Sequence, residues 1–121
     1  MKILVVDDSR AMRMLVTRTL RQAGFGDHDI VEAENGAQGL DLVASEAPDF
    51  ILSDWNMPEK SGIEFLEELR AGGNATPFGF VTSEGTAEMR QRASSAGALF
   101  LITKPFTPES FQSELGTHLA A

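Results

Sequence analysis

The chain has 121 residues, no cysteine and a formal net charge of −8. This length suits one folded domain, and the lack of cysteine excludes disulfide and thiol chemistry. The acidic balance argues against nucleic acid or an anionic membrane as the main partner, because both bind basic surfaces. No apolar run is long enough to span a bilayer and no signal peptide precedes the first apolar run, so we expect a cytoplasmic protein.

Five short apolar runs predict five β-strands. Most of the runs are continuous rather than alternating, which is typical of strands buried on both faces of a sheet. The predicted strands are residues 2–6, 29–33, 50–53, 78–82 and 98–102.

Stretches with helical spacing follow each of these runs. The predicted helices cover residues 9–23, 36–46, 62–71 and 85–96, and a fifth follows the cap residue Thr107. The Thr107-Pro108 pair is a strong helix-start signal, and Ser61 and Glu64 have capping-box spacing. Residues 85–96 have little apolar content, so we expect this helix to be the most mobile.

The apolar spacing also predicts which side chains of these helices face the core. For the first helix they are Met12, Leu15, Val16, Thr19 and Leu20, for the second Leu40 and Val43, and for the fifth Phe111, Leu115 and Leu119. The fifth helix then contains Gly116 in its interior. Trp55, the only tryptophan, is expected to be a partly exposed packing residue.

Strict alternation of five strands with five helices predicts an α/β fold, a single doubly wound parallel sheet with helices on both faces. Such a sheet binds ligands at the carboxyl ends of its strands. Four of the five predicted strands end in or near a polar residue that can converge there. These residues are Asp7, Asp8, Asp54, Thr82 and Lys104.

Three of these residues are carboxylates, and their mutual repulsion requires an explanation. At about 4 Å and an effective dielectric of about 20, each pair repels by roughly 4 kcal/mol. A hard cation with oxygen ligands, most simply Mg²⁺, relieves that repulsion. A carboxylate beside a metal, a hydroxyl and a lysine suits phosphoryl transfer, with Asp54 as the nucleophile that forms an acyl phosphate.

Four segments carry a resemblance to a known family. They are Val5-Val6-Asp7-Asp8-Ser9, Asp54-Trp55-Asn56-Met57-Pro58 with Gly62, Val81-Thr82-Ser83-Glu84, and Lys104-Pro105-Phe106. In this order the chain resembles, over residues 1–121, the receiver domain of a two-component response regulator of the CheY-like type. The resemblance implies a flavodoxin-like fold with strand order 2-1-3-4-5.

The family pattern assigns roles to these positions. It implies phosphorylation of Asp54 and Mg²⁺ ligation by Asp8, Asp54 and the main-chain carbonyl of Asn56, with Asp7 acting mainly through water. It implies that Thr82 and Lys104 bind the phosphoryl group. Asn56 and Glu84 match the positions that tune dephosphorylation, and the bond before Pro105 is expected to be cis.

One position departs from the family pattern. Three residues before Lys104 the family places Tyr or Phe, and this chain has Leu101. Phe100 precedes it and, by strand alternation, is expected on the other face of the sheet. The departure concerns transmission to the output surface and leaves the phosphorylation site intact.

The predicted function is that of a stand-alone, monomeric response regulator in a chemotaxis-type phosphorelay, not an enzyme with a separate substrate. A histidine kinase or phosphotransfer protein supplies the phosphoryl group, and the output is a protein bound at the face of the fourth helix, fifth strand and fifth helix. The alternative is a phosphate sink or relay shuttle. A flavin site is disfavoured by Asp7 and Asp8, a phosphohydrolase by Asn56, and an inert module by the intact set of site residues.

Overall fold

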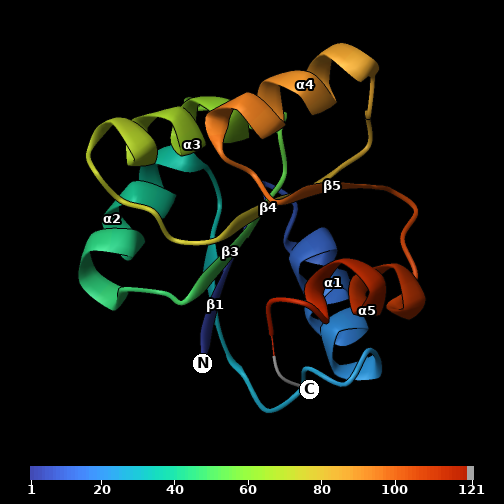
Figure 1. Ribbon diagram of the computed structural model, residues 1–121. Coiled ribbons are helices and arrows are strands. Elements are labelled where there is room, and N and C mark those ends of the chain that lie inside the picture. Colours follow the sequence, from blue (N-terminus) through green and yellow to red (C-terminus); the bar gives the residue numbers. More distant parts are fainter. Residues whose placement is uncertain (120–121) are drawn as a thin grey trace.

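The computed structural model describes residues 1–119. Its sheet has five parallel strands in the order β2-β1-β3-β4-β5, as expected. The strands are β1 (Lys2–Val6), β2 (Asp29–Ala33), β3 (Phe50–Ser53), β4 (Phe78–Thr82) and β5 (Phe100–Thr103). The helices are α1 (Arg10–Gln22), α2 (Gly36–Glu46), α3 (Gly62–Ala71), α4 (Ala87–Ala96) and α5 (Pro108–Leu115). The predicted doubly wound α/β fold is confirmed (Figure 1).

The sheet lies between two layers of helices (Figure 1), and an apolar core fills the space on each side of it. On one face α1 and α5 pack side by side, and their core includes Val16, Leu20 and Phe111. On the other face α2, α3 and α4 cover a core that includes Val43, Phe65 and Ala93. Phe100 belongs to the first core and Leu101 to the second, so the expected alternation along β5 is confirmed.

The register brings the ends of three strands level with one another. Val6 pairs with Ala33 of β2 and with Ser53 of β3. One residue further on, the N–H of Asp7 donates to the carbonyl of Ala33 at 3.1 Å. The N–H of Asp54 donates to the carbonyl of Val6 at 2.8 Å. These bonds continue the sheet by one step and hold the chain that carries the carboxylates in place.

The inward face of α1 differs from the prediction. Leu15 is 43% exposed, whereas Arg13 is buried together with Val16 and Leu20. Hydrogen bonds, and not apolar contacts, account for the burial of Arg13. The guanidinium of Arg13 donates to the carbonyl of Asp7 at 2.5 Å and to the carboxylate of Glu32 at 2.8 Å, which holds this long side chain against the sheet.

Three other boundaries and exposures need correction. The strand predicted at 98–102 begins at Phe100, because the N–H of Ala98 instead donates to the carbonyl of Ala93 and closes the end of α4. Gly116 lies at the end of α5 rather than inside it, and Leu119 is buried beyond the helix. Trp55 is buried against Phe80, with ring centroids 4.8 Å apart.

Among residues 1–119, no helix has both the length and the apolar character needed to cross a membrane.

Candidate functional site

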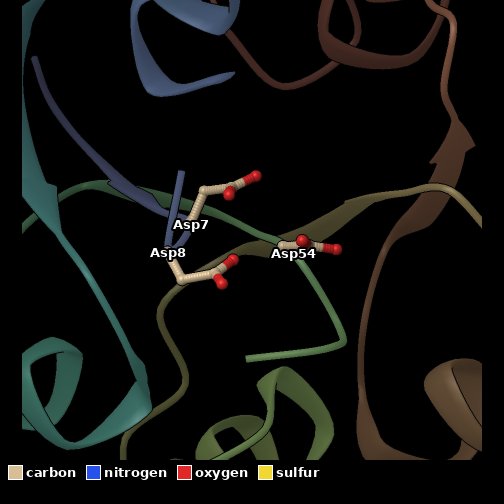
Figure 2. A group of neighbouring side chains, drawn as sticks. All are labelled: Asp7, Asp8 and Asp54. Carbon is tan, nitrogen blue, oxygen red and sulfur yellow. The ribbon is translucent and has the colours of Figure 1, made fainter. Parts of the chain in front are cut away.

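Three carboxylates meet at the carboxyl ends of the central strands (Figure 2). Asp7 and Asp8 follow β1, and Asp54 follows β3. One oxygen from each lies within 4.8 Å of the other two. Asp7 and Asp54 are buried and Asp8 is exposed, so the group opens to solvent on one side. An all-oxygen set of this kind fits a hard divalent cation such as Mg²⁺.

Lys104 links two of the three carboxylates. Its ammonium lies 3.1 Å from Oδ2 of Asp7 and 3.4 Å from Oδ2 of Asp54. The N–H of Lys104 donates to the carbonyl of Thr82 at 2.8 Å, which fixes the base of this side chain beside the end of β4. The following bond, Lys104–Pro105, is cis. The lysine thus supplies one positive charge to a group of three negative charges.

Burial dominates the electrostatics of Asp7. Removal of the carboxyl from water raises its pKa above the ordinary value. The N–H of Ser9, which lies 2.9 Å from Oδ1, and the ammonium of Lys104 oppose this by stabilising the carboxylate. The negative charge of Asp54 adds to the rise of the Asp7 pKa.

The main chain fixes one oxygen of the Asp54 carboxylate. Oδ1 accepts the N–H of Trp55 at 2.7 Å, whereas Oδ2 is the atom that faces Lys104. The main chain that follows is drawn back toward the site, since the N–H of Gly62 donates to the carbonyl of Trp55 at 2.8 Å. A carboxylate fixed through one oxygen leaves the second available for reaction with a phosphoryl group.

Thr82 contributes a hydroxyl without a partner. Its side chain is fully buried at the end of β4, and Oγ1 has no hydrogen-bond partner among residues 1–119. Buried hydroxyls are almost always paired, and an exception points to a ligand or a functional role. Thr82 is therefore available to donate to a phosphoryl oxygen.

The remaining predicted residues lie outside this group of contacts. Asn56 and Glu84 are exposed, in the loops that follow β3 and β4. Leu101 is buried in β5, away from the carboxylates and against the core beneath α4. The structure thus brings Asp7, Asp54 and Lys104 into direct contact.

Arg13 was not predicted as part of the site. Through Asp7 it holds the main chain that precedes Asp8, and through Glu32 it connects this turn to β2. An arginine on a helix is normally read as solvent-exposed. Only the break that it makes in the apolar face of α1, between Met12 and Val16, gives any signal in the sequence.

Comparison with known proteins supports a common family for this chain. The model of the response regulator receiver domain matches residues 3–115. A chemotaxis protein CheY homolog from Campylobacter jejuni is 39% identical over 118 residues, which cover 95% of this chain and 89% of that protein. Two structures of the chemotaxis response regulator CheY4 of Vibrio cholerae are also similar. They have TM-scores of 0.83 and 0.85 and sequence identities of 34% and 33%, and the match covers 98% of each chain.

Proposed function

The chain belongs to the response regulator receiver domain family, and we propose that it accepts a phosphoryl group on Asp54 from a phosphohistidine donor. The observation that carries this proposal is the fully buried, unpartnered hydroxyl of Thr82, at the end of the strand beside Asp54 and Lys104. A hydroxyl and an ammonium beside a carboxylate are the groups that an acyl phosphate needs around its oxygens.

The reaction is a direct displacement at phosphorus. Oδ2 of Asp54 forms the new P–O bond as the P–N bond of the phosphohistidine breaks, and the leaving imidazole takes a proton from solvent. Lys104 exchanges part of its contact with Asp54 for a phosphoryl oxygen, and Thr82 donates to another. No general base is required, because a carboxylate oxygen attacks the phosphorus directly.

We assign the Mg²⁺ site to Asp8, Asp54 and the carbonyl of Asn56, with Asp7 acting mainly through water. When bound, Mg²⁺ neutralises charge on the carboxylates and on the incoming phosphoryl oxygens. Lys104, which also contacts Asp7, holds Oδ2 of Asp54 in a polar environment. Asn56 and Glu84, exposed beside the site, are assigned to tuning the rate of dephosphorylation.

Phosphorylation is proposed to change which proteins the chain binds. Added charge at Asp54 draws Thr82 and Lys104 toward it, and the face formed by α4, β5 and α5 carries the output. Chemotaxis is the proposed pathway, and the names of the relatives, a CheY homolog and CheY4, support it. A histidine kinase or phosphotransfer protein is the proposed donor. The extent of the domain (1–121), the monomeric state and the cytoplasmic location stay predictions.

A phosphate sink or relay shuttle is the second candidate. The observation that favours it is Leu101, which is packed in the core where the family places an aromatic ring. Such a protein would be phosphorylated in the same way, but no downstream protein would bind it more tightly afterwards.

Trp55 provides the test, because its N–H bonds the acceptor and its ring is buried. Its fluorescence would be followed while Mg²⁺ and then acetyl phosphate are added to wild type, Asp54→Asn and Asp8→Ala. We expect a saturable Mg²⁺ response, weakened in Asp8→Ala, and a donor-dependent response absent in Asp54→Asn. Asp41→Asn, which removes an exposed carboxylate of α2, is the matched control.

Chemical analysis of the phosphoprotein decides the assignment of the acceptor. An acyl phosphate on Asp54 is labile to hydroxylamine, and Asp54→Asn should carry none. Hydroxylamine-sensitive phosphate on that variant would place the acceptor elsewhere.

A further inference from the structure

Arg90 connects the loop that precedes α4 to strand β5. From α4, its Nε donates to the carbonyl of Gly85 at 3.2 Å, and its Nη1 donates to the carbonyl of Leu101 at 3.1 Å. Gly85 lies in the loop of residues 83–86, which begins directly after Thr82. Leu101 lies in β5. We call these two hydrogen bonds the Arg90 bridge.

The two acceptors of the bridge differ in their freedom to move. Leu101 is held in the sheet, and β5 is an edge strand, so one row of its main-chain groups has no strand partner. Arg90 supplies a donor to that edge. Gly85 belongs to a loop whose residues are mostly exposed, so its carbonyl can leave the guanidinium without disturbing a core.

The loop fits closely against both partners. A Cβ atom on Gly85 would lie 2.6 Å from Cγ2 of Thr103 and 2.9 Å from Nη2 of Arg90. Both distances are shorter than side chains tolerate. The absence of a side chain at Gly85 therefore allows the loop to rest on β5 and its carbonyl to reach Arg90.

Few other contacts fix the first half of α4. Ala93, in the second half, is the only fully buried side chain of α4, and Met89, in the first half, is partly buried. The second arginine of the helix, Arg92, pairs with Glu67 on the surface, and both side chains are about half exposed. Exposed pairs contribute little, so the Arg90 bridge is the main polar contact between α4 and the sheet in this region.

We propose that the Arg90 bridge holds the 83–86 loop and α4 in the unphosphorylated arrangement and is released at Gly85 when Asp54 is phosphorylated. This inference rests on the proposed function. Movement of Thr82 toward the phosphoryl group pulls the loop that begins at residue 83, and Gly85 with it. Leu101 then takes part through its main-chain carbonyl, a role that does not require the aromatic ring that the family places there.

Hydrogen exchange in the metal-loaded protein tests this directly. In the absence of a phosphodonor, Arg90→Met should raise amide exchange in residues 83–90 by roughly tenfold, the loss expected for a charged donor. Arg92→Met, on the same helix, should leave it unchanged. Acetyl phosphate should raise exchange in the same segment of wild type and add little in Arg90→Met.

Two further readouts separate the bridge from a general loss of structure. Arg90→Met should be phosphorylated by acetyl phosphate faster than wild type, up to about tenfold, because the bridge no longer opposes the loop movement. Its Mg²⁺ affinity should stay that of wild type. Gly85→Ala, which displaces the loop from Thr103 and Arg90, should show the same increase in exchange.

The outcomes are distinct. Equal exchange in unphosphorylated wild type and Arg90→Met would overturn the inference, and so would phosphorylated wild type in which residues 83–90 stay protected. If wild type takes up no phosphoryl group, the proposed function fails and the release step falls with it. The comparison of unphosphorylated proteins then still decides whether Arg90 holds the loop.

Discussion

A Cβ atom on Gly62 would lie 2.0 Å from the carbonyl oxygen of Asp54. The first residue of α3 therefore rests directly on the main chain of the proposed phosphoacceptor, and the capping box of Ser61 and Glu64 fixes the start of that helix. Any side chain at Gly62 must push Asp54 or the helix away.

Gly62→Ala should lower both stability and metal affinity. Overpacking of this kind costs about 1–3 kcal/mol in free energy of unfolding, and displacement of Asp54 should weaken Mg²⁺ binding. Urea unfolding and Mg²⁺ titration measure the two effects. Gly72→Ala, at the other end of α3, is the control, since a Cβ there would have no neighbour closer than 3.5 Å. Wild-type Mg²⁺ affinity in Gly62→Ala would contradict the prediction.

Thr82→Val should separate stability from function. Replacement of an unpaired hydroxyl by a methyl group should leave the free energy of unfolding unchanged or raise it by up to about 1–2 kcal/mol. The fluorescence change with acetyl phosphate should shrink. Thr19→Val is the matched control, because Oγ1 of that buried threonine donates to the carbonyl of Leu15 at 2.8 Å and its loss should destabilise. A large destabilisation in Thr82→Val would indicate a structural role.

Lys104→Met should make stability depend more strongly on Mg²⁺. Without the ammonium, the Asp7 and Asp54 carboxylates lose their positive partner in metal-free protein, which should cost about 1–3 kcal/mol. Mg²⁺ should restore more stability to the variant than to wild type, because no lysine competes for the same oxygens. Thermal unfolding with and without EDTA measures this. Lys60→Met, which removes an ion pair with Glu68 on α3, should show no such metal dependence.

The raised pKa of Asp7 predicts a pH dependence in metal-free protein. Because burial raises this pKa in the folded state above its ordinary value of 3.8, folding favours the protonated form. The stability that Asp7 contributes is present below the unfolded pKa and is lost as pH rises through the folded pKa. In EDTA, Asp7→Asn should therefore gain stability relative to wild type as the pH rises above the ordinary pKa of 3.8 and through the raised pKa of the folded state. A flat or falling difference in urea unfolding would refute this.

Much of the fold could be predicted because the decisive signals are local. Four strands have the predicted bounds, and three of them, β1, β3 and β4, are largely buried apolar runs. The predicted start of the fifth strand was two residues too early, because Ala98 completes the end of α4, where Gly97 has a φ of 100°. Leu99, which the apolar run assigned to the strand, is 47% exposed.

The site, too, could be predicted only in part from the sequence. The positions of Asp7, Asp8 and Asp54 follow from strand ends and parallel pairing, which the sequence pattern reveals. The contacts of Arg13 and Arg90 do not, because each joins a helix to main-chain carbonyls of other segments. Every residue has a main-chain carbonyl, so the partner of such an arginine cannot be recognised in the sequence from its residue type.

The two apolar cores share no residue, since the sheet lies between them. The effects of substitutions in one core on the free energy of unfolding are thus expected to add to the effects of substitutions in the other core, with little coupling. The face that carries α1 and α5 can therefore accumulate changes during evolution while the α2–α3–α4 side keeps its packing. The fold can in this way acquire a new binding surface on one side of the sheet while the packing on the other side stays the same.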